Sequence, residues 1–270
     1  MTVVRLPDDV IGGLPEWRGA SWTRLAGGLT NRAWRLEKAG RKAVLKIDDE
    51  PRKPPYNTRL AEATVQSVAA RAGLANRVLF ADEQVYLTEY IEGTVWELNC
   101  LDKGDNIEQV AGALRRLHAL PLSGRSFDAV VAANKYVPKI GNPDENLLGV
   151  CLDMIKSMRR PHNLRFCHND LVVENIVATP KLKFLDWEYA CDNDPLFDLA
   201  TIIEHHELRE EQAQLLLNAY FDGSGEHWRP KLAEQRRLYL ALLWLWLAAR
   251  PDSSKQDLHA VAKRLTTSCS

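Results

Sequence analysis

The sequence predicts an α+β fold with segregated lobes, a small β-rich lobe followed by a larger and mostly helical one. Strand-like segments near the start enclose a single helical segment, and Gly93 follows them as a hinge, because glycine tolerates unusual backbone angles. Helical periodicity then dominates to the C-terminus, with one short β insertion. Alternating strands and helices would instead predict a doubly wound sheet. We therefore expect an N-lobe over residues 1–92 and a C-lobe over residues 93–270, with a cleft between them.

The elements of the N-lobe follow from alternation and turn residues. Residues 32–37 and 42–48 are predicted to be strands joined by a tight turn at Lys38-Ala39-Gly40. Residues 59–72 carry apolar side chains at helical spacing and stop at a glycine. Two further strands are predicted at 78–80 and 85–90. A two-stranded unit therefore opens the fold.

The elements of the C-lobe are mainly helical stripes. Apolar residues recur at helical spacing over 107–117 and 147–155. A β insertion is predicted at 175–177 and 182–185. The most apolar stretch, 239–249, is shorter than the roughly 20 residues that cross a membrane, so it predicts a buried helix.

Composition and charge exclude several classes of partner. The chain is 46% hydrophobic and 26% charged, and 35 Lys and Arg against 36 Asp and Glu give a net charge of −1. This balance does not favour a nucleic-acid or membrane surface. Five cysteines without a CxxC pair indicate reduced thiols, and the start of the chain lacks a secretory pattern, so we expect a cytoplasmic protein. The oligomeric state is left open.

The segment HNDLVVEN, residues 168–175, carries candidate chemistry together with Asp186. Phosphoryl transfer needs oxygen ligands for a metal and a carboxylate that orients the acceptor hydroxyl. Asp170 precedes Asn175 by five residues and Asp186 by sixteen, so a loop and two strands can bring the three side chains together at one magnesium site. Asp170 and Asn175 alone could equally form an Asx turn.

These motifs resemble the choline kinase and aminoglycoside phosphotransferase superfamily, relatives of the protein kinases. The resemblance rests on HNDLVVEN and on FLDWEYACDNDPLFDLA, residues 184–200. It implies a two-lobed protein-kinase-like fold that uses ATP and Mg²⁺, with Asp170 as catalytic base and Asn175 and Asp186 as magnesium ligands. It gives His168 and Asp198 structural roles in holding the catalytic loop. From its position alone, Asp198 would instead cap a helix.

An upstream half of the nucleotide site is predicted in the same order as in kinases. The glycine turn offers Gly27, Gly28, Thr30 and Asn31 to phosphate, although such a turn alone is usually only a hairpin. Lys46 on the next strand and Glu62 on the following helix fit the kinase ion pair, while a solvated edge lysine is the alternative for Lys46. By resemblance, the adenine meets backbone groups of Glu89 and Ile91.

The acceptor is predicted to be a small alcohol carrying a cation, which aromatic faces and a carboxylate would recognise. The candidate substrate-binding residues are Glu188, Tyr189, Glu204, Trp244 and Trp246. The two tryptophans are two positions apart on a helix, so one of them should belong to the core. His205 and His206 are interpreted as ordinary helix residues.

The predicted function is an ATP- and Mg²⁺-dependent kinase of choline or ethanolamine. Thiamine kinase and aminoglycoside phosphotransferase are the enzymatic alternatives. A kinase fold that only binds a ligand is the non-enzymatic alternative, and it predicts loss of at least one of Lys46, Asp170, Asn175 and Asp186. None is lost.

Overall fold

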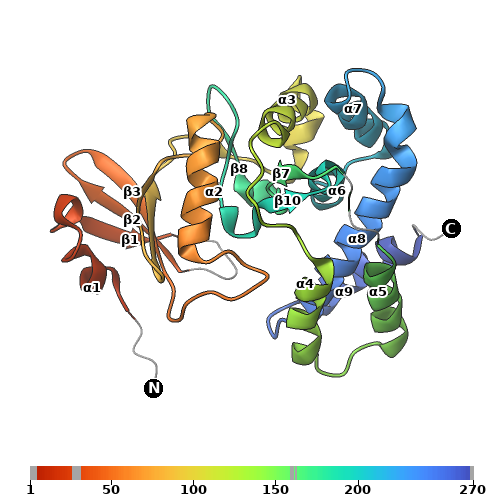
Figure 1. Cartoon of the computed structure of the whole chain (residues 1–270), viewed down its shortest axis with the longest axis horizontal. Coiled ribbons are helices and arrows are strands. Elements are labelled where there is room, and N and C mark those ends of the chain that lie inside the picture. The colour runs from red at the N-terminus through yellow and green to blue at the C-terminus, as the bar shows by residue number, and fades with distance from the viewer. Residues whose placement is uncertain (1–4, 26–31, 159–160, 162, 268–270) are drawn as a thin grey trace. The chain divides into compact units, whose positions relative to one another are not determined.

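The computed structural model describes residues 5–25, 32–158, 161 and 163–267. The chain divides into two compact units (Figure 1). Unit 1 is built from the described residues of Met1–Thr94 and Val177–Tyr189, and unit 2 from those of Val95–Ile176 and Ala190–Ser270. Within the described residues, no helix is long and apolar enough to cross a membrane.

Unit 1 is an antiparallel sheet with one long helix. Its elements are α1 (Pro7–Ile11), β1 (Ser21–Arg24), β2 (Ala33–Lys38), β3 (Arg41–Ile47), α2 (Arg59–Arg71), β4 (Val78–Ala81), β5 (Val85–Glu89), β6 (Thr94–Val95, which runs on into unit 2), β8 (Ile176–Ala178, which enters from unit 2) and β9 (Lys183–Phe184). The strand order in the main sheet is β1-β2-β3-β5-β4, and α2 contacts β4 and β5. The predicted hairpin, helix and strand pair are confirmed. The prediction that two strands open the fold was wrong, because α1 and β1 precede them.

Alternation along β3 gives the sheet two different faces. Ala43, Leu45 and Ile47 are almost fully buried and join a core cluster with Trp17 from the N-terminal segment. Lys46 must therefore point to the opposite face, because successive strand residues alternate. The β2–β3 turn uses positive φ angles of 49° at Ala39 and 74° at Gly40, as a two-residue hairpin turn requires.

The helix α2 begins and ends where local chemistry dictates. The side chain of Thr58 caps its N-terminus by accepting a hydrogen bond from the Ala61 N–H at 3.2 Å. Gly73, with φ of 74°, follows its C-terminus, which confirms the predicted glycine stop.

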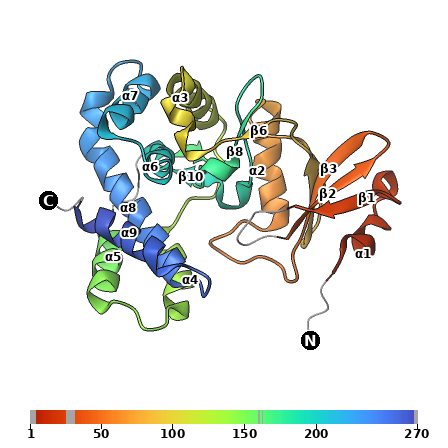
Figure 2. The same ribbon diagram turned by 180° about the vertical axis from the view of Figure 1, so that it is seen from behind.

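Unit 2 is helical around a central helix. Its helices and strands are α3 (Asn106–His118), α4 (Ala129–Tyr136), α5 (Glu145–Ser157), β7 (Arg165–Cys167), β10 (Cys191–Asn193), α6 (Pro195–His205), α7 (Glu210–Tyr220), α8 (Arg229–Ala248) and α9 (Lys255–Thr267). Helix α8 contacts α4, α5, α6 and α9, and the views from both sides show α5 and α9 beside it (Figure 2). Because Tyr239, Leu240, Ala241 and Leu245 are buried, the predicted apolar helix is confirmed.

The boundary between the units lies two residues from the predicted 92/93 division. The structure also places residues 177–189 in unit 1, whereas the sequence prediction placed them in the C-lobe. Long-range hydrogen bonds explain this, since the Phe184 N–H donates to the Leu74 carbonyl at 2.8 Å and the Asn57 N–H to the Glu188 carbonyl at 2.6 Å.

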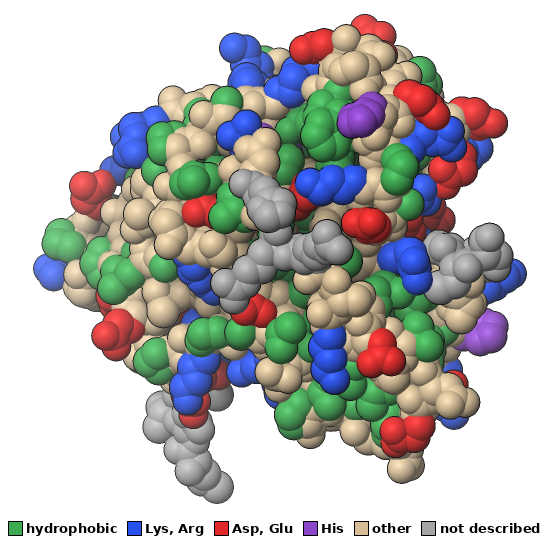
Figure 3. Space-filling model, turned by 45° about the vertical axis from the view of Figure 1, so that its right-hand side comes forward, with side chains coloured by type: hydrophobic (Ala, Val, Ile, Leu, Met, Phe, Trp, Pro, Cys, Tyr) green, Lys and Arg blue, Asp and Glu red, His purple; other side chains and the backbone are tan. Residues whose placement is uncertain are grey.

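Charged side chains of both signs are interspersed on the face of the molecule seen in Figure 3. This distribution matches the near-zero net charge of the chain.

Gly93 is required by close packing against the β8 strand. A Cβ atom there would lie 2.6 Å from the Ala178 carbonyl oxygen and 2.7 Å from Cγ1 of Val177, closer than packed atoms tolerate. We expect Gly93→Ala to lower the free energy of unfolding by about 1–3 kcal/mol, measured by urea denaturation. The control is Gly112→Ala in α3, where a Cβ meets nothing within 4 Å and alanine should stabilise by roughly 0.5–1 kcal/mol. Equal effects of the two substitutions would contradict the packing argument.

Candidate functional site

The catalytic loop candidate lies in unit 2, directly after β7. Within it, Asn175 Nδ2 donates to the Asp170 carbonyl oxygen at 2.9 Å and to Asp170 Oδ2 at 3.1 Å. The loop therefore brings these two predicted residues together and fixes the orientation of the carboxylate. Asn175 closes a 3-10 turn, Val173–Asn175, so β8 begins one residue later than the sequence predicted. Its Oδ1 atom takes no hydrogen bond from the described residues, which leaves it available to a metal ion.

Asp198 anchors the start of this loop from inside unit 2. The side chain is fully buried, and its two oxygens accept hydrogen bonds from the backbone N–H groups of His168, at 2.9 Å, and Asn169, at 2.6 Å. His118 Nε2 contacts the same carboxylate at 3.0 Å. These bonds hold the loop at Asn169, whose backbone has φ of 65° and so lies in the left-handed region, which is uncommon for a residue other than glycine.

The capping role considered for Asp198 was wrong. Asp194 caps α6, since its Oδ1 accepts the Leu196 N–H at 3.0 Å. Asp198 lies one turn further along the helix, where its side chain faces the interior. His168 is also fully buried, next to Phe166 and Cys167 at the end of β7.

Two histidines hold the middle of the loop, although the sequence interpretation treated them as ordinary helix residues. His206, which follows the last turn of α6, donates from Nε2 to the Leu171 carbonyl at 3.2 Å. His205 Nδ1 accepts the Val173 N–H at 3.3 Å. Burial lowers the pKa of both imidazoles, that of His206 from 6.5 to about 4. The adjacent pair was the only sequence signal, and their loop partners lie more than thirty residues earlier in the chain.

In unit 1, Lys46 and Asp186 form an ion pair. Lys46 Nζ lies 2.9 Å from Asp186 Oδ1. Burial opposes ionisation of Asp186, but the Lys46 ammonium outweighs it, with Arg52 and Arg59 nearby, and the pKa of the carboxyl is lowered. Asp186 also has φ of 57°, a conformation that costs energy for a residue with a Cβ and that clusters at functional sites.

The prediction of an ion pair between Lys46 and Glu62 was wrong. Among the ion pairs of the described residues, Glu62 is held by Arg59 at 2.8 Å and lies 3.8 Å from Arg52. Arg59 is fully buried and also binds Asp48 through two parallel hydrogen bonds of 2.7 Å each. It lies three residues before Glu62 on α2, so the planar guanidinium reaches both carboxylates without help from Lys46.

Glu188 and Tyr189 lie in unit 1, beside this charge cluster. Glu188 forms an ion pair with Arg52, while burial, and then the nearby charge of Asp186, raises the pKa of its carboxyl. Tyr189 packs on Tyr56 with ring centroids 4.9 Å apart. A cavity of about 360 Å³ opens here and is lined by Arg32, Ile47, Asp48, Asp49, Glu50, Arg52, Tyr56 and Glu188.

The remaining acceptor candidates lie in unit 2 and differ in accessibility. Trp244 is 4% exposed and belongs to the core, as predicted for one of the two tryptophans. Trp246 is half-buried, and the Arg250 guanidinium lies 4.6 Å from its ring centroid. Glu204 was predicted to offer negative charge to the acceptor, but it is buried and ion-paired with Arg236 and Arg264. Its charge is already neutralised.

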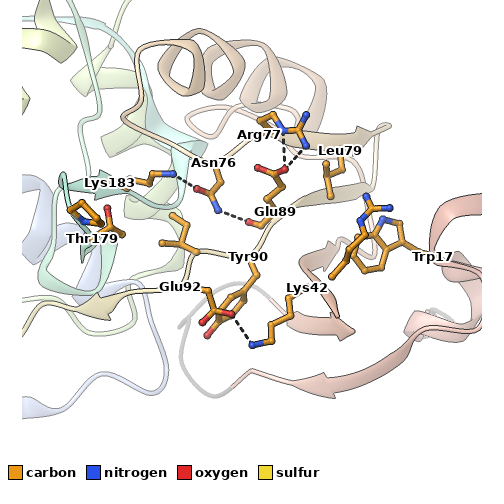
Figure 4. A pocket seen from close by; sticks show the side chains of 13 residues that line it. Trp17, Lys42, Asn76, Arg77, Leu79, Glu89, Tyr90, Glu92, Thr179 and Lys183 are labelled. Carbon is orange, nitrogen blue, oxygen red and sulfur yellow. Dashed lines mark hydrogen bonds and ion pairs between the residues drawn. The ribbon is translucent and has the colours of Figure 1, made fainter. Parts of the chain in front are cut away.

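The hinge after β5 presents backbone groups that could meet an adenine edge. The Glu89 N–H donates to the Arg77 carbonyl at 3.0 Å, and the Tyr90 N–H to the Lys42 carbonyl at 3.2 Å. The Ile91 N–H has no acceptor among the described residues. Figure 4 shows this segment, where the Glu89 carbonyl accepts a hydrogen bond from Asn76 Nδ2 at 3.0 Å. The predicted glycine-turn residues Gly27, Gly28, Thr30 and Asn31 lie outside the described residues.

Fold and site together define a class of protein, a protein-kinase-like phosphotransferase acting on small molecules. The chain belongs to the phosphotransferase enzyme family, whose model matches residues 21–234. It is therefore an enzyme and a small-molecule kinase, as the sequence predicted.

Individual proteins resemble the chain over most of its length. The chain is 32% identical to Protein LicA of Haemophilus influenzae over 260 residues, which cover 88% of this chain and 76% of that protein. It is 25% identical to a thiamine kinase of Escherichia coli over 228 residues, 82% of this chain and 74% of that protein. The solved choline kinase LicA of Streptococcus pneumoniae shares the fold with a TM-score of 0.74 and 20% identity, covering 92% of both chains.

Arg59 is the cation that two acidic side chains of unit 1, Asp48 and Glu62, share. We expect Arg59→Met to lower the free energy of unfolding by about 3–5 kcal/mol, because Asp48 and Glu62 lose a buried partner. Urea denaturation measures it. The control, Arg71→Met at the exposed end of the same helix, should change stability by no more than about 0.5 kcal/mol. A similar small change in both variants would show that Arg59 does not neutralise the cluster.

His206 makes stability depend on pH in the mildly acidic range. Its folded pKa of about 4 lies below the ordinary 6.5, so between these values the unfolded chain binds a proton that the folded chain does not. Stability should therefore fall as pH falls through this window, by up to about 3 kcal/mol from this group.

The check is the free energy of unfolding of wild type and His206→Gln between pH 7 and pH 4.5. The variant should show a shallower decline, whereas His259→Gln, at an exposed position in α9, should follow wild type. Parallel curves for all three proteins would exclude His206 as the source.

Proposed function

We propose that this enzyme transfers the γ-phosphoryl group of ATP, with Mg²⁺, to the hydroxyl of a small cationic alcohol, most simply choline or ethanolamine. The observation that carries the proposal is the Asp170–Asn175 pair, in which an amide hydrogen bond orients a carboxylate on a loop fixed by Asp198. A carboxylate in that state can accept the proton of a hydroxyl group during phosphoryl transfer.

The nucleotide half of the proposal uses residues of unit 1. The Ile91 N–H and the Glu89 carbonyl supply a donor and an acceptor for an adenine edge. Lys46 binds the α and β phosphates. The glycine turn with Gly27, Gly28, Thr30 and Asn31 is proposed to cradle phosphate with its backbone amides.

The side chains fit a magnesium ion. Asp186 is ionised and already attracts one cation, Lys46, while Asn175 retains an unused amide oxygen. Carboxylate and amide oxygens are the hard ligands that Mg²⁺ prefers. When bound, the ion would neutralise charge on the transferred phosphoryl group. The proposal requires units 1 and 2 to present Asp186 and Asn175 to the same nucleotide.

The choice of acceptor draws on the relatives and on aromatic side chains. One relative at 32% identity is LicA, and a solved LicA is a choline kinase. Trp246, whose ring already carries the Arg250 guanidinium, and Tyr189, which packs on Tyr56, are the aromatic candidates for a cationic group. Glu188 is the remaining carboxylate candidate, because Glu204 is held by two arginines. The similarity to a thiamine kinase keeps thiamine, another cationic alcohol, as the second candidate.

The test is ADP release by the purified protein with Mg-ATP and one acceptor at a time. Choline and ethanolamine should give the highest kcat/KM in a panel that includes thiamine, an aminoglycoside and a small sugar. Asp170→Asn should lower kcat by about 10²–10⁴-fold while the Kd for Mg-ATP stays unchanged. Asp186→Ala should weaken the magnesium-dependent binding of ATP.

The matched control is Asp153→Asn, at an exposed position in α5, which should retain wild-type kcat and KM. Full turnover in Asp170→Asn would remove this residue from the chemistry. No ADP release with any acceptor, together with no thermal shift by Mg-ATP, would favour a kinase fold that binds a ligand without catalysis.

A further inference from the structure

A concavity of about 500 Å³ lies at the hinge of unit 1 (Figure 4). It is lined by residues from the N-terminal segment, from β3, from the β4–β5 region with the hinge, and from the turn between β8 and β9. Lys46 and Asp186 do not line it. Arg41 and Lys42 line it from the first two residues of β3, one on each face of the sheet, and Lys46 lies four residues after Lys42, roughly 13 Å along the strand. The concavity is therefore distinct from the Lys46–Asp186 pair.

The charge of this lining is positive. Its charged members are Arg41, Lys42, Arg77 and Lys183 against Glu89 and Glu92, an excess of two positive charges. Three of the cations are paired at the surface, Arg41 with Glu16 at 3.0 Å, Lys42 with Glu92 at 2.7 Å and Arg77 with Glu89 at 2.8 Å. Glu92 and Arg77 are each 72% exposed in these pairs. Exposed pairs of this kind contribute little, so an anion can compete for the cations at small cost.

Lys183 is the cation of this lining that forms no ion pair within the described part of the chain, although, after the stronger effect of Arg77, its charge helps to lower the pKa of the Glu89 carboxyl. Its Nζ donates to Asn76 Oδ1 at 2.8 Å, which is a neutral acceptor, and its side chain is half-buried. An ammonium group that has given up part of its hydration for one neutral partner gains from an anionic ligand.

Asn76 links this lysine to the hinge. It is 8% exposed, and its Nδ2 donates to the Glu89 carbonyl. The backbone carbonyl oxygen of Asn76 accepts a hydrogen bond from Gln66 Nε2 of α2 at 2.9 Å. The Asn76 amide therefore has a fixed orientation, which presents its oxygen to Lys183 and its nitrogen to the hinge backbone.

We propose that this concavity is a second binding site, for a small ligand carrying a phosphate group, with Lys183 as its central cation. Lys183 supplies a cation that forms no ion pair among the described residues, the exposed pairs of Arg41, Lys42 and Arg77 can exchange a carboxylate for phosphate, and the arginine forks suit its tetrahedral oxygens. The ligand contacts the hinge segment, where it reaches the Glu89 carbonyl through Lys183 and Asn76. The site does not depend on which acceptor the enzyme phosphorylates.

The probe is inorganic phosphate, titrated at constant ionic strength into the full-length protein saturated with Mg-ADP and followed by calorimetry. Lys183→Gln should weaken the Kd about tenfold, the value of one charge-assisted hydrogen bond. The matched control, Lys181→Gln, removes the same charge two residues earlier, at an exposed position that does not line the concavity. It should bind phosphate as wild type does.

Hydrogen exchange locates the bound phosphate. Peptides covering residues 89–92 and 179–183 should gain protection, while those covering 168–175 stay unchanged. Equal affinity in wild type and Lys183→Gln, equal weakening in both lysine variants, or protection confined to 168–175 would overturn the proposal. If Lys183→Gln does not fold, Arg77→Gln, at a 72% exposed side chain, takes its place with the same expected loss of affinity.

Discussion

The loop of this kinase that carries Asp170 depends on one buried carboxylate, that of Asp198. A charge removed from water needs several hydrogen bonds, and this one obtains them from two consecutive backbone N–H groups and from His118. The consequence is that the loop leaves β7 in a single geometry, with a left-handed residue directly before Asp170. His205 and His206 then fix its middle. The loop is thus attached to α6 at both its beginning and its centre, and a rigid helix rather than the loop itself positions the carboxylate proposed to act on the acceptor.

In unit 1, four acidic side chains lie close together, and their mutual repulsion has to be offset by nearby cations. Asp48, Glu62, Asp186 and Glu188 each form an ion pair with Lys46, Arg52 or Arg59. Arg59 is shared between two acids, and Arg52 joins Glu188 to the same group. Because Arg59 satisfies Glu62, Lys46 is left to pair with Asp186. A magnesium ion bound by Asp186 would compete with Lys46 for that carboxylate, and Lys46 would then be available to phosphate oxygens.

The predicted elements were confirmed where the local sequence pattern was strong. The sequence predicted the β2–β3 hairpin, α2 with its glycine stop and the apolar helix α8, because alternation, turn glycines and helical periodicity are properties of short segments. Residues 177–189 were assigned to the wrong unit for the opposite reason. Their hydrogen bonds go to Leu74 and to Asn57, more than a hundred residues earlier, and nothing in a local pattern encodes such partners.

The sequence by itself determined the class of enzyme and the members of its proposed site, since HNDLVVEN, Asp186 and Lys46 occur in the order that kinase chemistry needs. Only the tertiary structure decided their partners. It paired Lys46 with Asp186 and Glu62 with Arg59, occupied Glu204 with two arginines, and gave His206 a loop carbonyl. The physical reason is that a buried charge or polar group takes the nearest partner that folding brings to it. Which partner is nearest is set by the packing of segments that are remote in the sequence and not by spacing along the chain.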